Sequence, residues 1–242
     1  MEPRAKIPLT STLSQSLLAS SPLSVAASFG QLNEVRRLLS DEESDPNEDS
    51  PLLFATTTGK LEVVKVLLRD PRIDVNVMRY DLATPLFVAC QESRLEIAKT
   101  LLCTPGVDVN HQDSEGWSPF FLVCQKGNLE FVKLLLRHPD VDINLATKEN
   151  HTPLYAVAQR GHTKTLKWIL ASGLEVDITT PWERTHFTPL EQAKRNGFKE
   201  IADLLMKFQE GPTATREELR KELGLERSPS SLLLRLPMSL TD

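Results

Sequence analysis

The 242 residues include 40% hydrophobic and 25% charged side chains, which is close to the average for folded water-soluble domains and far from disordered or membrane-spanning chains. A formal net charge of -5 disfavours nucleic acid as a partner, because proteins that bind phosphate backbones usually carry a basic stripe. The three cysteines, Cys90, Cys103 and Cys124, are too scattered for a disulfide framework or a zinc knot.

Residues 1–19 contain only brief apolar runs, too short for a secretory signal or a membrane span. We expect this segment to be flexible or to form a capping helix. Its serine-rich, acid-poor composition leaves a transit peptide as the alternative. The chain is otherwise expected to lie in the cytoplasm, with the nucleus left open as a second compartment, and to make no membrane contact.

From residue 20 onward, proline recurs at a nearly constant interval. Pro51, Pro85, Pro119 and Pro153 lie 34 residues apart, Pro189 follows after 36 and Pro22 precedes after 29. Each proline follows a serine or threonine, and eight residues beyond it stands a glycine, or a serine at position 93. A hydroxyl can cap the first helical turn and proline fits its first position, while glycine ends a helix in the left-handed conformation. A short helix is therefore predicted after each proline.

A second amphipathic run follows each glycine, as in residues 61–68 and 129–136. Polar segments such as Asp74-Val75-Asn76 come next and predict extended arms joined by tight turns. Helices this short are marginal in isolation, so neighbouring units must supply the missing burial. The sequence thus predicts about six stacked helix-turn-helix units over residues 20–208, the first of them shortened.

This pattern resembles the ankyrin repeat family. The resemblance implies an all-α solenoid, an ankyrin repeat stack of helix-turn-helix units with β-hairpin-like fingers. The histidine of the family's T-P-L-H motif is replaced here by Ser24, Leu53, Phe87, Phe121, Tyr155 and Glu191. Apolar packing is expected to replace the usual threonine–histidine hydrogen bond in the middle repeats. The first repeat, which ends in an acidic link at residues 41–45, is expected to be a cap or poorly ordered.

Beyond the repeats, residues 209–226 predict a C-terminal capping helix. Thr215 with Glu218 three positions later is typical of a capping box, and the helix could lie over the end of the last repeat. Residues 227–242 are expected to be a disordered tail. The alternative is that this tail contains a short linear motif that docks a partner.

No pattern of catalytic or ligand-binding residues stands out. Cys90 and Cys124 occupy the same place in successive repeats and are interpreted as small core residues. The histidines show no metal spacing, and no glycine-rich phosphate loop or serine nucleophile motif is present. We therefore expect a protein that is not an enzyme, without a cofactor, a metal or catalytic residues.

The resemblance implies that partners bind to the concave face of the first helices and to the hairpin tips. Tyr80, Trp117 and Trp182 at the tips are the best candidates, because aromatic residues often dominate interface energy. The alternative is that each tryptophan packs onto the neighbouring hairpin. The candidate partner-binding residues are Tyr80, Gln91, Glu92, Glu115, Trp117, Gln125, Lys126, Gln159, Arg160, Trp182 and Arg184.

Two hypotheses for function follow. The first is a monomeric, non-catalytic adaptor or inhibitor that binds another protein through these residues. The second is a scaffold whose array mainly positions the tail motif. The resemblance also implies hydroxylation of the hairpin asparagines Asn76, Asn110 and Asn144, against the alternative that each side chain simply bonds to its own turn.

Overall fold

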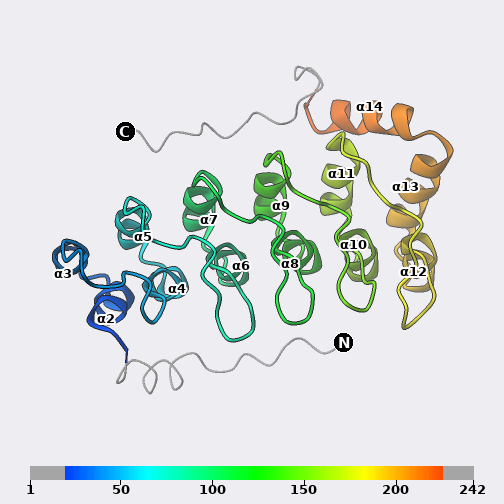
Figure 1. Ribbon diagram of the computed structural model, residues 1–242. Helices are drawn as coiled ribbons and strands as arrows, with labels where there is room; N and C mark the ends of the chain where they lie inside the picture. Colours follow the sequence, from blue (N-terminus) through cyan, green and yellow to red (C-terminus); the bar gives the residue numbers. More distant parts are fainter. Residues whose placement is uncertain (1–19, 226–242) are drawn as a thin grey trace.

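The computed structural model describes residues 20–225, in which the chain forms thirteen helices and no strand. Figure 1 shows the helices as a curved stack of pairs. They are α2 (Pro22–Phe29), α3 (Leu32–Leu39), α4 (Pro51–Thr58), α5 (Leu61–Leu67), α6 (Pro85–Gln91), α7 (Leu95–Leu102), α8 (Pro119–Lys126), α9 (Leu129–Leu135), α10 (Pro153–Arg160), α11 (Thr163–Ala171), α12 (Pro189–Arg195), α13 (Lys199–Glu210) and α14 (Pro212–Glu222). The predicted flexible or capping segment (residues 1–19) and the predicted disordered tail (residues 227–242) lie outside the described residues.

The helices form two rows (Figure 1). One row holds the first helix of each pair, α2, α4, α6, α8, α10 and α12, and the other holds the second helix of each pair, α3, α5, α7, α9, α11 and α13. Buried side chains from Leu23 to Leu219 make one continuous core between and within these rows. Each helix has only 7 to 12 residues, so the stack gains its stability from neighbour contacts rather than from any single helix. The all-helical repeat stack predicted from the sequence is confirmed.

The first helices begin and end as the proline and glycine pattern predicts. The hydroxyls of Thr84, Ser118, Thr152 and Thr188 each accept a hydrogen bond from the backbone N–H three residues later. Ser50 is different, because its φ of 56° is left-handed and its side chain makes no cap bond. After α6, Ser93 adopts a φ of 56°, so it takes the left-handed conformation that glycine has in the other repeats.

The histidine of the family motif is replaced by buried side chains, as expected. Phe87, Phe121 and Tyr155 expose at most 1% of their surface and extend the apolar core. The rings of Trp117, Phe121, His151 and Tyr155 follow one another with centroids 5.0 to 5.1 Å apart. An aromatic row thus crosses the repeat interfaces in the middle of the stack.

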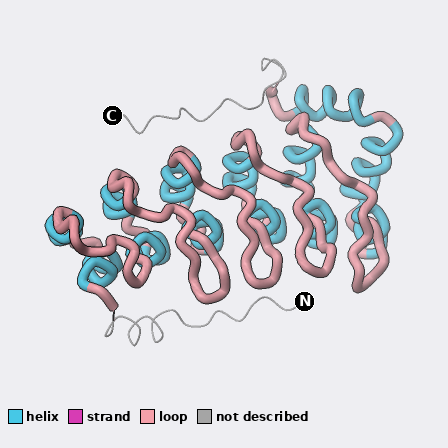
Figure 2. Tube along the Cα trace, viewed as in Figure 1, coloured by secondary structure: helices cyan, strands magenta, loops and turns pink. Residues whose placement is uncertain are grey.

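Between a second helix and the next first helix, the chain forms a projecting loop that we call a finger (Figure 2). The fingers comprise residues 45–50, 77–83, 111–117, 145–151 and 180–187. Among the described residues these fingers contain no strand, and at least two backbone hydrogen bonds close each of the last four. In the 77–83 finger they run from the Arg79 N–H to the Ala83 carbonyl at 3.0 Å and from the Leu82 N–H to the Arg79 carbonyl at 2.8 Å. Neighbouring fingers are linked by the Ser114 N–H, which donates to the Asp81 carbonyl at 2.8 Å.

An asparagine joins each finger base to the next repeat. The Asn110 amide donates to the Asp140 carbonyl at 2.7 Å, and its side-chain oxygen accepts from the Asp142 N–H at 2.8 Å. Asn47, Asn76 and Asn144 make the same pair of bonds one repeat along. The alternative that each asparagine bonds to its own turn is therefore wrong. The aspartate two residues earlier caps that turn instead, as Asp108 does for Asn110.

Replacing Asn110 with alanine is expected to lower the free energy of unfolding by about 1–3 kcal/mol, because the Asp140 carbonyl and the Asp142 N–H lose their partner. Urea denaturation followed by circular dichroism measures this change. Asn128→Ala is the control, since Asn128 precedes α9 without a side-chain cap bond. Equal losses in the two variants would show that the asparagine bridge contributes nothing specific.

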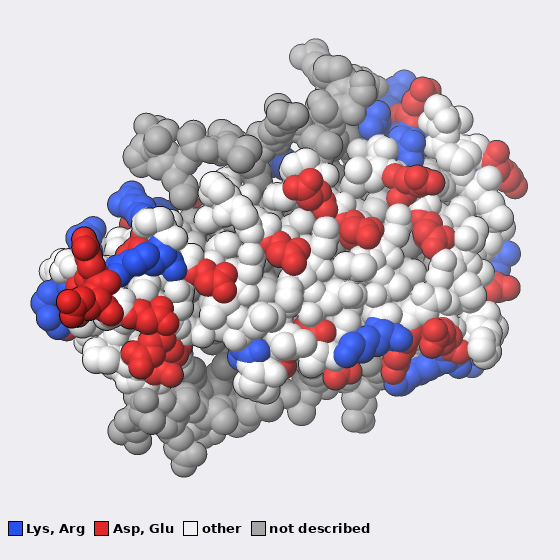
Figure 3. Space-filling view, viewed as in Figure 1, with Lys and Arg blue, Asp and Glu red and all other residues white. Residues whose placement is uncertain are grey.

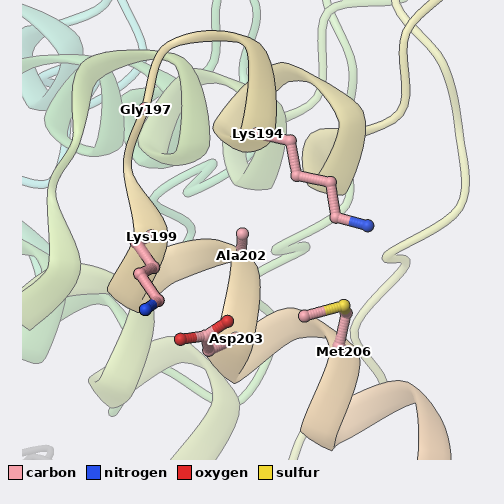
Figure 4. A pocket seen from close by; sticks show the side chains of 6 residues that line it. All are labelled: Lys194, Gly197, Lys199, Ala202, Asp203 and Met206. Carbon is pink, nitrogen blue, oxygen red and sulfur yellow. The ribbon is translucent and has the colours of Figure 1, made fainter.

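Within residues 20–225, no further repeat packs on the outer face of α12 and α13. At Gly161 an added Cβ would come within 2.7 Å of the Phe198 ring of the next repeat, whereas at Gly197 nothing lies within 4 Å. Figure 4 shows the side chains that line the hollow beside Gly197, which come from α12 and α13 and include Lys194, Lys199 and Asp203. Charged residues on this outer face suit a terminal repeat that must remain in water.

The C-terminal helix α14 does not cover that face. It packs instead across α11 and α13, where Arg216 and Arg220 donate to the carbonyls of Leu170 and Ala171 at 3.3 and 3.0 Å. The expected capping box is also wrong, because the helix begins after Gly211 and Thr215 lies within it. The Thr215 hydroxyl donates to the Lys207 carbonyl at 3.0 Å and so ties α14 to α13.

Candidate functional site

The concave surface is formed by the ends of the first helices. The two positions before each closing residue hold Ser28 and Phe29, Thr57 and Thr58, Gln91 and Glu92, Gln125 and Lys126, Gln159 and Arg160, and Arg195 and Asn196. Phe29, Lys126 and Arg160 are exposed, whereas the three glutamines are half-buried. The face therefore offers side chains that change from apolar to basic along the stack.

We call these paired positions the concave ladder. Several of its backbone carbonyls already accept hydrogen bonds from the following repeat. Arg94 donates to the Thr57 carbonyl at 3.2 Å, Lys126 to that of Gln91 at 2.5 Å, and Asn196 to that of Gln159 at 2.9 Å. The His162 Nε2 lies 3.1 Å from the Gln125 carbonyl. Since these carbonyls would otherwise be unpaired helix ends, the contacts stiffen the concave face and leave only its side chains for a partner.

The 77–83 finger is the most apolar exposed part of the described surface. Tyr80 is 86% exposed, Met78 50% and Leu82 45%. With Phe29, which is 62% exposed, they are the large hydrophobic residues that remain open to solvent. The sequence predicted Tyr80 but missed the other three. Phe29 stands at the ladder position that other repeats fill with Thr, Glu, Lys, Arg or Asn, and that comparison could have revealed it.

Leu82 adopts an unusual backbone conformation. Its φ is +62°, and the same turn position is held by Gly116, Asn150 and His186 in later fingers. The left-handed region costs a branched or bulky residue about 1–2 kcal/mol, a cost that glycine avoids and asparagine reduces. Leucine is thus unfavourable here for folding, and 45% of its surface is exposed to solvent.

Arg79 fixes the orientation of this finger. Its guanidinium donates to both carboxylate oxygens of Asp81, at 2.8 and 2.6 Å, and lies 3.4 Å from the Gln91 side-chain oxygen. Burial acts to raise the pKa of Asp81, but the hydrogen bonds from Arg79 outweigh it and hold that pKa below its ordinary value. The guanidinium carbon also lies 5.6 Å from the Tyr80 ring centre. The finger and the concave ladder therefore form one connected surface.

The expectation of an exposed Trp182 is wrong. Trp182 exposes only 6% of its surface and stacks on His151 with ring centroids 4.6 Å apart. The 180–187 finger, which is one residue longer than the three before it, places the Trp182 indole against the preceding finger. Trp182 therefore packs onto the neighbouring finger, which is the alternative given for the tryptophans, and it offers little surface to a partner.

The other candidate residues lie along the row of later fingers. Trp117 is half-buried against Phe121, with centroids 5.1 Å apart, while Glu115 beside it is exposed. Arg184 is exposed and forms an ion pair with Glu149 of the preceding finger. These fingers therefore present charged side chains over an aromatic interior.

No candidate for chemistry emerges from the described residues. Cys90 and Cys124 are fully buried, which agrees with their interpretation as core residues. Burial raises the pKa of the Cys90 thiol to about 12. Within residues 20–225 no cluster of three or more potential metal ligands occurs. Across the same residues, every helix is too short or too polar to cross a bilayer.

Comparisons with known proteins agree with this geometry. A family model described as "Ankyrin repeats (3 copies)" matches residues 23–113, 86–180 and 120–216. A crystal structure of an ankyrin repeat domain from Acinetobacter baumannii is similar, with a TM-score of 0.68 and 22% sequence identity over 76% of this chain and 96% of that one. No curated protein sequence gives a significant match. Because the matched residues cover most of the chain and carry its repeat geometry, the chain belongs to the ankyrin repeat family.

Proposed function

We propose that the chain is a non-catalytic adaptor or inhibitor that binds a partner protein through its concave face and finger tips. Ankyrin repeats are generally protein–protein interaction modules, which supports this class of function. The observation that carries the proposal is the exposed group of Met78, Tyr80 and Leu82 beside the ladder of Gln91 and Lys126. Large exposed apolar side chains of this kind mark interaction sites on soluble proteins.

The proposed setting is a reducing intracellular compartment, in which the chain acts as a monomer. Cys90, Cys103 and Cys124 are all free thiols, and disulfides are rare where the cell keeps thiols reduced. The partner is a protein rather than nucleic acid or a lipid surface, since the chain has a net charge of -5.

Affinity capture with mass spectrometry tests the proposal. Full-length chain and a Tyr80→Ser/Arg160→Glu variant are compared, with Glu62→Ala/Lys65→Ala as the control, because that ion pair lies on the second helix α5. The proposal expects proteins captured by the wild type and the control to be lost from the Tyr80→Ser/Arg160→Glu variant by at least tenfold. Loss only on deletion of residues 227–242 would instead support the scaffold hypothesis.

A further inference from the structure

We infer that the surface made by the 77–83 finger and the acidic link of residues 41–49 docks an extended partner segment that carries an aliphatic or aromatic side chain beside two or more Lys or Arg residues. The inference rests on the proposed function and adds the chemistry of the partner. We call this surface the acidic–apolar site. Its apolar part comes from Met78, Tyr80 and Leu82, which are at least 45% exposed.

Leu82 is aliphatic, whereas the other described non-glycine residues with a left-handed φ are polar, namely Asp49, Ser50, Ser93, Asn150 and His186. A leucine at φ +62° opposes folding, yet its side chain is 45% exposed and adds little to the core. Asn150 occupies the same turn position two fingers later without that penalty. Strained residues retained against folding occur preferentially at ligand-binding sites, so this strain indicates that the leucine side chain serves a contact outside the folded chain.

The finger is held in place before any partner arrives. Arg79 grips Asp81 through two hydrogen bonds, and the Asp81 carbonyl accepts the Ser114 N–H of the next finger at 2.8 Å. A preorganised anchor loses less conformational freedom on binding than a flexible loop does. Tyr80 and Leu82 are therefore presented in a fixed arrangement, as rigid anchors for a partner are.

The charge beside these anchors is negative. Exposed carboxylates crowd the link between α3 and α4, and they belong to Asp41, Glu42, Glu43, Asp45, Glu48 and Asp49. The guanidinium of Arg72 reaches this link, where it donates to the Leu39 carbonyl at 2.9 Å, but it is already paired with Asp70 at 2.7 Å. Among the described residues none of these six carboxylates forms an ion pair, so opposite charge on a partner would be attracted and oriented.

The link and the 77–83 finger are neighbours in the stack. Asn47 of the link region bonds to the Arg72 carbonyl and the Asp74 N–H, which lie on the arm that leads to this finger. In Figure 3 a dense group of red atoms lies at the end where α2 to α4 lie, with blue atoms around it, and red and blue atoms lie together on the lower edge toward the other end. The later fingers also carry exposed cations, Lys148 and Arg184, the second of which pairs with Glu149. A partner with basic residues is thus directed to the α2 end.

Selection from a phage-displayed library of random 14-residue peptides against the full chain tests the inference. The selected peptides, called winners below, are expected to carry an apolar residue flanked by Lys or Arg. The affinity of synthetic copies for the chain is then measured by fluorescence anisotropy. Glu42→Lys/Glu43→Lys/Asp45→Lys should weaken these peptides by tenfold or more and flatten their salt dependence. Asp49 is kept, because its carboxylate accepts the Ser21 N–H.

Leu82→Asn is the decisive second variant. It removes the leucine side chain and relieves the backbone, so thermal unfolding should occur at the wild-type temperature or a few degrees above it, while peptide affinity falls about tenfold. The control is Glu96→Lys/Lys99→Glu, which reverses an exposed ion pair on the second helix α7. A stable Leu82→Asn variant with lost affinity cannot be explained by misfolding.

Other results would overturn the inference. Winners without basic residues, or winners that keep their affinity in both the charge-reversed chain and Leu82→Asn, exclude this partner chemistry. If the winners instead lose affinity on Lys126→Glu/Arg160→Glu, the acidic–apolar site is not the docking site, although the proposed function stands. Absence of any enriched peptide also overturns the inference, and affinity capture of whole proteins then decides the proposed function separately.

Discussion

Replacing Phe121 with alanine is expected to cost about 3–5 kcal/mol in the free energy of unfolding, the usual range for removing a buried phenylalanine. Phe121 is fully buried in α8, and its ring centre lies 5.1 Å from those of both Trp117 and His151. Its loss leaves a cavity at the interface between two repeats. Because each repeat is stabilised mainly by its neighbours, the two halves of the array should begin to unfold separately.

Guanidinium denaturation followed by both circular dichroism and tryptophan fluorescence measures this effect. The two signals should coincide for the wild type and separate for Phe121→Ala. Phe29→Ala is a matched control, because it removes the same ring from a site that is 62% exposed and should change stability by only about 0.5 kcal/mol. A similar small loss for both variants would contradict the packing described for the middle of the stack.

Acidification from pH 6.5 to 4 is expected to destabilise the protein through His151. Burial lowers the pKa of His151 to about 4, and the charges of Arg160 and Arg184 act in the same direction. In the unfolded chain the histidine pKa is about 6.5. Between these values the unfolded state binds a proton that the folded state does not, so stability is complete above pH 6.5 and falls as the pH drops.

The size of the effect follows from the pKa difference. Each pH unit in this window lowers stability by at most about 1.4 kcal/mol, and the full window by roughly 3 kcal/mol. The His151 Nε2 is buried without a hydrogen-bond partner, so a proton there would create an unpaired charge between Phe121, Tyr155 and Trp182.

Urea denaturation at a series of pH values measures the slope, and the His151→Phe variant should flatten it while keeping the aromatic stack. His186→Phe is the control, since His186 is exposed. Asp70 and Asp81 have pKa values that are lower in the folded state than in the unfolded chain. Their contribution to stability is lost as the pH falls below about 4, the ordinary aspartate pKa. An unchanged slope in His151→Phe would show that another group causes the dependence.

The repeat architecture was predictable because its signals are local. Proline with a preceding hydroxyl starts each first helix and a glycine ends it, and the same chemistry applies wherever those residues stand. The C-terminal helix shows how local signals can compete. Pro212 is the true start signal, whereas Thr215 and Glu218 imitate a capping box within the helix. Thr215 is used instead for a bond to α13.

The candidate surface was harder to predict because exposure depends on the neighbouring repeat. Trp182, like Tyr80, is an aromatic residue of a finger, but it stacks on His151 of the preceding finger, and no residue near it in sequence reports that contact. Leu82 was missed for another reason. Its position in the turn is recognisable only when the fingers are superposed, since Gly116, Asn150 and His186 share its φ but not its chemistry.

The way α14 folds back has a mechanical consequence. Arg216 and Arg220 attach it to the end of α11, and Lys167 of α11 pairs with Glu222 at 2.8 Å. Tension applied at the C-terminus would therefore load several bonds in parallel along α14 before it reached α13. Force applied directly after α14 should therefore be resisted before the final repeat peels away, whereas force applied directly at Pro22 enters the stack through α2.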